Sequence, residues 1–249
     1  MLAKCEFHCH SKEDPWDNQI GHSAEELVGR AKVLGFDFVA LTHHTKIHFP
    51  ETLKDAAEKA GILMVPSCEL CVEGNDLLVI NAPENAEGIL TKWDGIRDFK
   101  KNFPEALIIA PHPHHVAAGS MGHRRLKALA DSWDAVEICH FYTSMINPTR
   151  RTERFARRNH IPLIATSDAH SLKGFGQNFT LVETEGETLD WPQLAEAVRK
   201  GNTLPVHAPI PWGAFARKLG HILKETWRHR HGNPRKQPQK HCPKKGKNG

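Results

Sequence analysis

The stretch Ile161–His170, IPLIATSDAH, carries the pattern that decides the fold. A short apolar run ends in two residues that can bind a metal ion, Asp168 and His170. Similar apolar runs recur along the chain and alternate with helical patterns; FDFVALT at 36–42, for example, follows SAEELVGRAKVLG at 23–35. Helices that alternate with short, fully apolar strands indicate parallel βα units. About six or seven such units in roughly 200 residues favour a barrel over a small open sheet.

The alternation of helices and strands also predicts the domain organisation. Ser23, with Glu26 three residues later, has the sequence of a capping box and predicts the start of a helix. The alternation stops near Pro209, so we expect one α/β domain over 1–208. An amphipathic helix is expected over 209–231, and a basic, disordered tail over 232–249.

Residues that can bind metals gather at the predicted strand ends. In a parallel barrel all strand carboxyl ends open onto one face, where active sites form. The chain also begins with His8-Cys9-His10, and alternate side chains of a strand point to the same face. These positions predict a metal site at the strand ends, and its candidate residues are His8, His10, His43-His44, Glu69, His112 with the neighbouring His114 and His115, His140, Asp168 and His170.

Composition agrees with a metal-binding protein. The chain has 18 histidines, and neutral imidazole is the commonest metal ligand among side chains. The net charge of +4 divides into +10 from Arg217 onward and −6 before it. No apolar run approaches the length of a membrane span and no signal-peptide pattern opens the chain, so a cytoplasmic protein is expected.

The mixed ligand set predicts the metals and their chemistry. Imidazoles combined with carboxylates suit Zn²⁺, Mn²⁺ or Fe²⁺. The candidate ligands exceed the need of one ion, so two or three divalent ions bridged by Glu69 are expected. Such clusters bind phosphoryl oxygens and generate a hydroxide nucleophile near neutral pH.

Six segments in order resemble the polymerase-and-histidinol-phosphatase (PHP) family of metal-dependent phosphoesterases. They are FHCHS, LTHH, CELCVEG, APHPHH, EICHFY and TSDAHS, between residue 5 and about residue 185. The resemblance implies a distorted (β/α)7 barrel with a trinuclear metal site at the carboxyl ends of the strands. It also implies catalysis through a metal-bound hydroxide, with Glu69, His112 and Asp168 as the central residues.

The resemblance assigns the ligands by position. One ion would take His8, His10, Glu69 and Asp168; a second would take Glu69, His112 and His140. A third would take His44, His170 and an acid from the loop SKEDPWDN. That acid is either Asp14 or Asp17, and Asp17 is favoured because it lies nearer the following helix. The usual Thr-Asp-His appears here as Thr42-His43-His44, so His43 replaces an acidic residue.

The resemblance leaves several substrates open. Phosphate esters are expected, with nucleotides or short oligonucleotides favoured because the basic tail suits nucleic acid. His114, Arg124 and Arg150 are candidate contacts for the substrate phosphate. The alternatives are a histidinol-phosphate phosphatase and, in another class, a non-catalytic nucleic-acid-binding module with structural metals.

Overall fold

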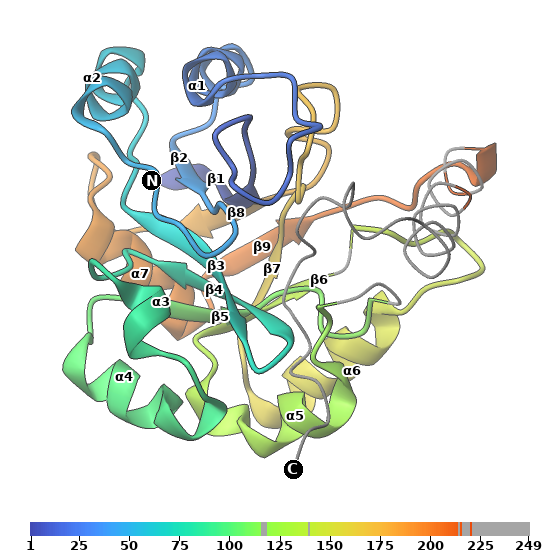
Figure 1. The fold of residues 1–249 in the computed structure, drawn as a ribbon. Coiled ribbons are helices and arrows are strands. Elements are labelled where there is room, and N and C mark those ends of the chain that lie inside the picture. The colour runs from blue at the N-terminus through green and yellow to red at the C-terminus, as the bar shows by residue number, and fades with distance from the viewer. Residues whose placement is uncertain (116–118, 139, 214, 216–219, 221–249) are drawn as a thin grey trace, which may run out of the picture.

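The fold is a mixed α/β arrangement with two sheets at its centre (Figure 1). The structure is a computed structural model and describes residues 1–115, 119–138 and 140–213, together with Phe215 and Gly220. The first sheet has the order β2-β1-β8-β9 and contains β1 (Leu2–Cys9), β2 (Phe38–Leu41), β8 (Phe179–Glu183) and β9 (Thr203–Val206). The second has the order β3-β4-β5-β6-β7 and contains β3 (Ser67–Val72), β4 (Asn75–Ile80), β5 (Leu107–Ala110), β6 (Ala135–Ile138) and β7 (Leu163–Ala165).

The helix predicted to start at Ser23 is present in the structure. The capping box of Ser23 and Glu26 is present at the start of the first helix, where the Ser23 side chain accepts from the Glu26 backbone N–H. The longer helices are α1 (Ala24–Val33), α2 (Glu51–Ala60), α6 (Thr149–Asn159) and α7 (Trp191–Lys200). The shorter ones are α3 (Ala86–Ile89), η1 (Trp93–Gly95), α4 (Ile96–Asn102), α5 (Gly122–Ala128) and η2 (Ala130–Ser132).

The expected parallel barrel is not confirmed, because the sheets are not closed into a barrel. Among the strand pairs of the described residues, β1–β2, β5–β6 and β6–β7 are parallel, whereas the others are antiparallel. The strands β3 and β4 form an antiparallel hairpin, since Glu73 and Gly74 both have positive φ and turn the chain in two residues. Glu69 also does not follow the end of a strand, as its place among the predicted strand ends implied, but lies inside β3.

Isolated bridges join the sheets where they meet. Phe38 pairs with Leu63, and His44 pairs with Glu69, so β2 meets the segment that leads into β3. On the other side, the Thr180 hydroxyl of β8 donates to the carbonyl of Ala165 in β7. The metal-competent residues therefore lie where two separately paired sheets come together.

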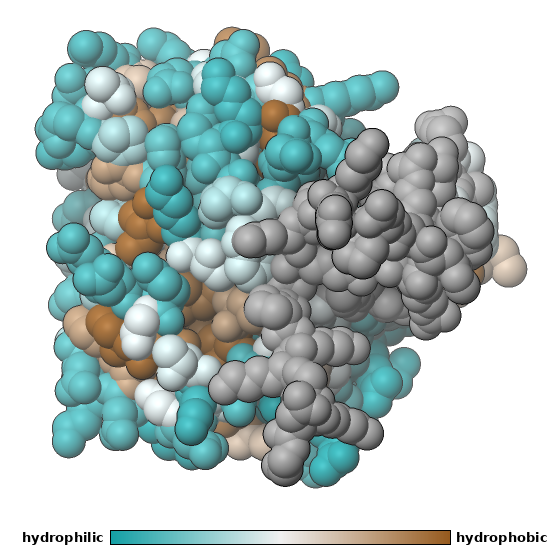
Figure 2. Space-filling model, viewed as in Figure 1, coloured by the Kyte–Doolittle hydropathy of each residue, from teal (hydrophilic) through white to brown (hydrophobic). Residues whose placement is uncertain are grey.

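The inner faces of both sheets share one hydrophobic core. Phe7 and Phe38 of the first sheet are buried with Leu78, Ile109 and Ile164 of the second. Outside the core, hydrophilic residues cover most of the surface over α1 and α2 (Figure 2). Among the residues that the structure describes, no helix is long and apolar enough to cross a membrane.

The predicted C-terminal helix at 209–231 lies mostly, and the basic tail at 232–249 entirely, outside the described residues. The predicted boundary near residue 208 stays a prediction.

Candidate metal centre

The fold gathers the predicted ligands from strands that are far apart in sequence. His8 and His10 come from the end of β1, and His44 follows β2. From the second sheet come the remaining ligands, on or directly after its strands: Glu69 (β3), His112 (β5), His140 (β6), and Asp168 and His170 (β7). Both sheets therefore contribute to one centre.

Two carboxylates, Glu69 and Asp168, lie in the middle of this group. His8 Nε2 lies 3.4 Å from Glu69 Oε2 and 3.4 Å from Asp168 Oδ1. His10 Nε2 lies 3.6 and 3.5 Å from the same two oxygens. Within the described part of the chain, neither Nε2 atom has a hydrogen-bond partner, although both are buried. Buried nitrogen atoms of this kind need a partner, and a cation supplies one.

The separations fit ligands that share one ion. Two ligand atoms at about 2.05 Å from an ion, at a tetrahedral angle, lie roughly 3.3 Å apart. The four nitrogen–oxygen distances, 3.4 to 3.6 Å, are close to that value. His8, His10, Glu69 and Asp168 therefore fit a cation, and two imidazoles with two carboxylates suit Zn²⁺, Mn²⁺ or Fe²⁺.

The other predicted ligands flank these four. On the Glu69 side, His44 Nε2 lies 3.3 Å from Oε2, and His112 Nε2 lies 3.6 Å from Oε1. On the Asp168 side, His170 Nε2 lies 3.4 Å from Oδ1, and His140 Nδ1 lies 3.5 Å from Oδ2. Both carboxylates thus have histidines near each oxygen, an arrangement in which each carboxylate could bridge neighbouring ions.

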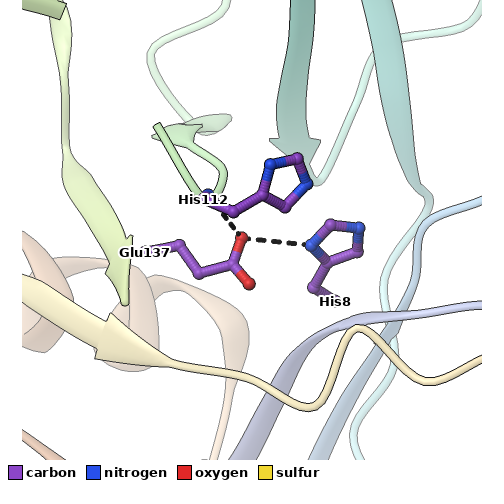
Figure 3. A group of neighbouring side chains, drawn as sticks. All are labelled: His8, His112 and Glu137. Atoms are coloured by element: carbon purple, nitrogen blue, oxygen red, sulfur yellow. Dashed lines mark hydrogen bonds and ion pairs between the residues drawn. The ribbon is translucent and has the colours of Figure 1, made fainter. Parts of the chain in front are cut away.

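A buried glutamate behind His8 fixes the orientation of that ring. Glu137 Oε2 lies 3.1 Å from His8 Nδ1 and also accepts from the backbone N–H of His112 at 3.3 Å (Figure 3). The Thr166 hydroxyl donates to the other carboxylate oxygen. Because a carboxylate only accepts, Nδ1 of His8 donates to Glu137, and Nε2, which faces Glu69 and Asp168, is the nitrogen that would bind a metal ion.

The loop after β1 orients three further rings in the same way. Asp14 Oδ2 lies 2.9 Å from His10 Nδ1 and 2.8 Å from His44 Nδ1. Asp17 Oδ2 lies 2.7 Å from His170 Nδ1, and Asp17 Oδ1 accepts from the Gln19 backbone. The structure therefore brings both candidate acids to the site, each on the Nδ1 side of its histidines.

The pKa values of the acidic side chains reflect the many ionisable groups that lie close together in the centre. Burial opposes ionisation of Glu69, but His8 and His44 hold its pKa well below the usual range. Burial likewise opposes ionisation of Asp168, whose pKa is held well below the usual range mainly by His8. The hydrogen bond from His170 lowers the pKa of Asp17 to about 2. The centre is therefore rich in ionised carboxylates and favours cations.

Strained backbone positions two of the ligands. His112 has φ of 27° and Asp168 has φ of 43°, values that side-chain-bearing residues rarely adopt. Such strain persists only where the surroundings impose it, and it gathers at functional sites. For Asp168, Glu6 helps to hold the strained backbone, because it accepts hydrogen bonds from the backbone N–H groups of His8 and Ser167 at 3.1 Å.

Sequence reasoning missed three buried carboxylates: Glu6, Asp76 and Glu137. Glu6 and Glu137 lie inside otherwise apolar strands. A charged residue in such a strand is unusual, and this could have marked both as candidate site residues. Asp76 lies opposite Cys71 in the β3–β4 hairpin, on the face that carries Glu69. Oxygen and nitrogen atoms of Asp76, Glu69 and His112 all lie within 4.8 Å of one another, and burial raises the pKa of Asp76 to about 7.

The predicted phosphate contacts are placed less centrally. His114 Nδ1 lies 2.9 Å from the Thr152 hydroxyl, and burial lowers the pKa of His114 to about 4. Arg124 and Arg150 are exposed on α5 and α6. His43, in the place of the usual acid, is buried, and its Nε2 lies 2.8 Å from the Ser11 hydroxyl.

Comparison with known proteins gives one family match. A family profile described as "PHP-associated" matches residues 148–203. No curated protein matches the chain significantly.

Solved structures share the fold at low sequence identity. PsfC from Pseudomonas syringae PB-5123 has a TM-score of 0.60 and 15% identity, covering 91% of this chain and 99% of its own. The lesion-specific endonuclease PfuEndoQ from Pyrococcus furiosus has a TM-score of 0.60 and 16% identity, covering 82% of this chain and 58% of its own. A candidate metal-dependent phosphoesterase from Bifidobacterium adolescentis has a TM-score of 0.51 and 14% identity, covering 79% of this chain and 96% of its own.

The chain thus spans little more than half of the endonuclease and nearly the whole of the other two proteins. At these identities the likeness concerns the fold. The PHP-associated profile matches residues 148–203, and the solved structures share the overall fold of the chain.

Proposed function

We propose that this chain is a metal-dependent phosphoesterase that hydrolyses phosphate esters of nucleotides or short oligonucleotides. The observation that carries the proposal is the convergence of His8 and His10 on Glu69 and Asp168, at separations that fit a shared ion. A closed structural zinc site would use four Cys or His ligands, whereas this centre mixes imidazoles with carboxylates. The mixed set argues against a merely structural metal.

We expect His8, His10, Glu69 and Asp168 to hold one divalent ion. His44, His112, His140 and His170 are the candidates for one or two more, whereas Asp17, the favoured loop acid, lies on the Nδ1 side of His170 and orients that ring. When bound, divalent ions supply Lewis-acid chemistry, which neutralises phosphoryl oxygens and lowers the pKa of water.

The residues of the chain supply orientation and charge. Glu137, Asp14 and Asp17 accept from the Nδ1 atoms of the histidines and fix which ring nitrogen faces the centre. Of the predicted phosphate contacts, His114 lies nearest along the chain to a candidate metal ligand, two residues after His112.

Support for a nucleotide or oligonucleotide substrate comes from charge and from the shared fold. Several arginines lie on α5 and α6, and guanidinium groups match phosphate well. A further structure with this fold, at a TM-score of 0.52 and 16% identity, is Endonuclease Q in complex with a duplex substrate.

A substrate panel tests the proposal. Metal-free protein would be reloaded with Mn²⁺ or Zn²⁺ and assayed on phosphomonoesters, nucleotides and 5′-phosphorylated oligonucleotides. We expect turnover that chelators abolish and that Glu69→Ala lacks, while Glu84→Ala at an exposed carboxylate retains it. Protein that binds metal but turns over nothing in the panel would contradict the proposal.

A further inference from the structure

A basic groove lies between α5 and α6, outside the metal centre. It has a volume of about 360 Å³ and is lined by Lys127 of α5 and by Arg151, Arg154 and Arg158 of α6, with His123 and Phe155 also in its wall. The rings of His123 and Phe155 meet edge to face across the groove, which holds the two helices together there.

The cations of this groove have no acidic partner. No carboxylate lines the groove, and none of its four Lys and Arg side chains forms an ion pair among the described residues. By contrast, the exposed Arg97 forms an ion pair with Asp131. Glu153 lies on the opposite face of α6 from Arg151, Arg154 and Arg158. The three arginines, at i, i+3 and i+7, therefore repel one another along one helix face.

The groove is joined to the loop that carries a predicted metal ligand. The ring of His123 stacks on that of His114, with centroids 5.7 Å apart and planes 29° apart. The Ser120 hydroxyl donates to the carbonyl of His112, and the Gly122 backbone N–H donates to the carbonyl of Pro113. The α5 wall of the groove is therefore anchored beside His112.

We infer that this groove binds the phosphodiester backbone of a nucleic-acid strand. A polyanion relieves the repulsion among the arginines, and guanidinium forks match phosphate oxygens. From Arg151 to Arg158 the row extends about 10 Å along the helix axis, enough for more than one phosphate. The inference rests on the proposed function in that it names the substrate class, but binding here requires no hydrolysis.

The test measures binding without turnover. The full chain is stripped of metal with EDTA and titrated with a fluorescein-labelled oligothymidylate at several salt concentrations, with anisotropy as the readout. In the variant Arg151→Gln/Arg154→Gln/Arg158→Gln, we expect affinity to fall at least roughly tenfold at low salt. The slope of log K against log salt should become shallower by about 2, since each lost phosphate contact on a single strand removes about 0.7.

A charge-matched control separates the groove from net charge. Arg30→Gln/Lys32→Gln/Lys59→Gln removes the same charge from α1 and α2, at the opposite end of the molecule (Figure 1). This control should bind as the unmodified chain does, and circular dichroism should show both variants folded. Three outcomes would each overturn the inference. They are an unchanged salt slope in the groove variant, an equal loss of affinity in the control, and displacement of the strand by a nucleoside monophosphate at equal phosphate concentration. Hydrolytic failure in the substrate panel would leave this result unaffected.

Discussion

At the residue scale, the centre depends on which nitrogen of each histidine faces inward. Glu137, Asp14 and Asp17 accept from Nδ1 atoms, so the Nε2 atoms of His8, His10, His44 and His170 turn toward Glu69 or Asp168. Outer carboxylates of this kind fix the tautomer and increase the basicity of the ligand nitrogen. Each of these three acids can therefore affect metal binding without contacting an ion.

Replacement of Glu137 by Gln tests this role. The amide keeps the size of the side chain but removes the anionic acceptor from His8 Nδ1, so we expect metal affinity to fall by roughly 10- to 100-fold. Calorimetric titration with Mn²⁺ or Zn²⁺ measures the change. Glu183→Gln, at an exposed position of β8, is the control, and equal affinity in both variants would exclude the orienting role of Glu137.

Replacement of Glu69 by Ala should have a larger effect on metal content. Glu69 approaches His8, His10 and His44 through Oε2 and His112 through Oε1, so its loss removes a shared partner from four histidines. We expect elemental analysis to show the loss of at least one ion per chain relative to the unmodified protein. Full metal content in this variant would show that Glu69 is not a bridging ligand.

At the element scale, the helices could be predicted from local sequence, whereas the strand pairing could not. Ser23 and Glu26 predict the start of α1 because a capping box acts within four residues. The β3–β4 hairpin depends on Glu73-Gly74, a short signal inside an apolar region that also fits a βα unit. Whether the strands close into a barrel depends on contacts between strands that are far apart in sequence. No local sequence pattern predicts these contacts.

The same distinction holds for the site. His8, His10, Asp168 and His170 were predictable because they end strands or lie beside one another in sequence. Glu137 and Asp76 were not placed at the site. Glu137 meets His8 only where the two sheets come together, and Asp76 meets Glu69 only through the register of the β3–β4 hairpin.

The start of α1 also anchors the acidic loop of the centre. Glu13 Oε2 accepts from the backbone N–H of Ala24 at 3.1 Å, and Ser11 donates to the same oxygen. Ser23→Ala removes the helix cap but none of these loop contacts. We therefore expect the free energy of unfolding to fall by about 1 kcal/mol while metal affinity is unchanged. Denaturant unfolding and calorimetry measure the two quantities, with Thr52→Ala in the exposed first turn of α2 as the control. A parallel fall in metal affinity would mean that the cap also positions Asp14 or Asp17.

At the scale of the whole molecule, the predicted ligands connect two sheets that are also joined by isolated bridges and by a shared hydrophobic core. His8 and His10 belong to the first sheet, whereas Glu69 and His112 belong to the second. A cation held between them would act as a cross-link in the folded state only. Without it, the buried carboxylates of Glu69 and Asp168 lose a source of compensating charge.

Metal removal should therefore destabilise the whole fold and not one loop. A ligand present at about 100 times its dissociation constant stabilises by about 2.7 kcal/mol, which for a chain of this size corresponds to a rise in Tm of roughly 5–10 °C. We expect EDTA to lower the Tm by that amount in a single transition, because both sheets lose the same link. Glu69→Ala should show a much smaller EDTA effect, since it has less metal to lose. An unchanged Tm after chelation of metal-loaded protein would mean that the ions do not join the two sheets.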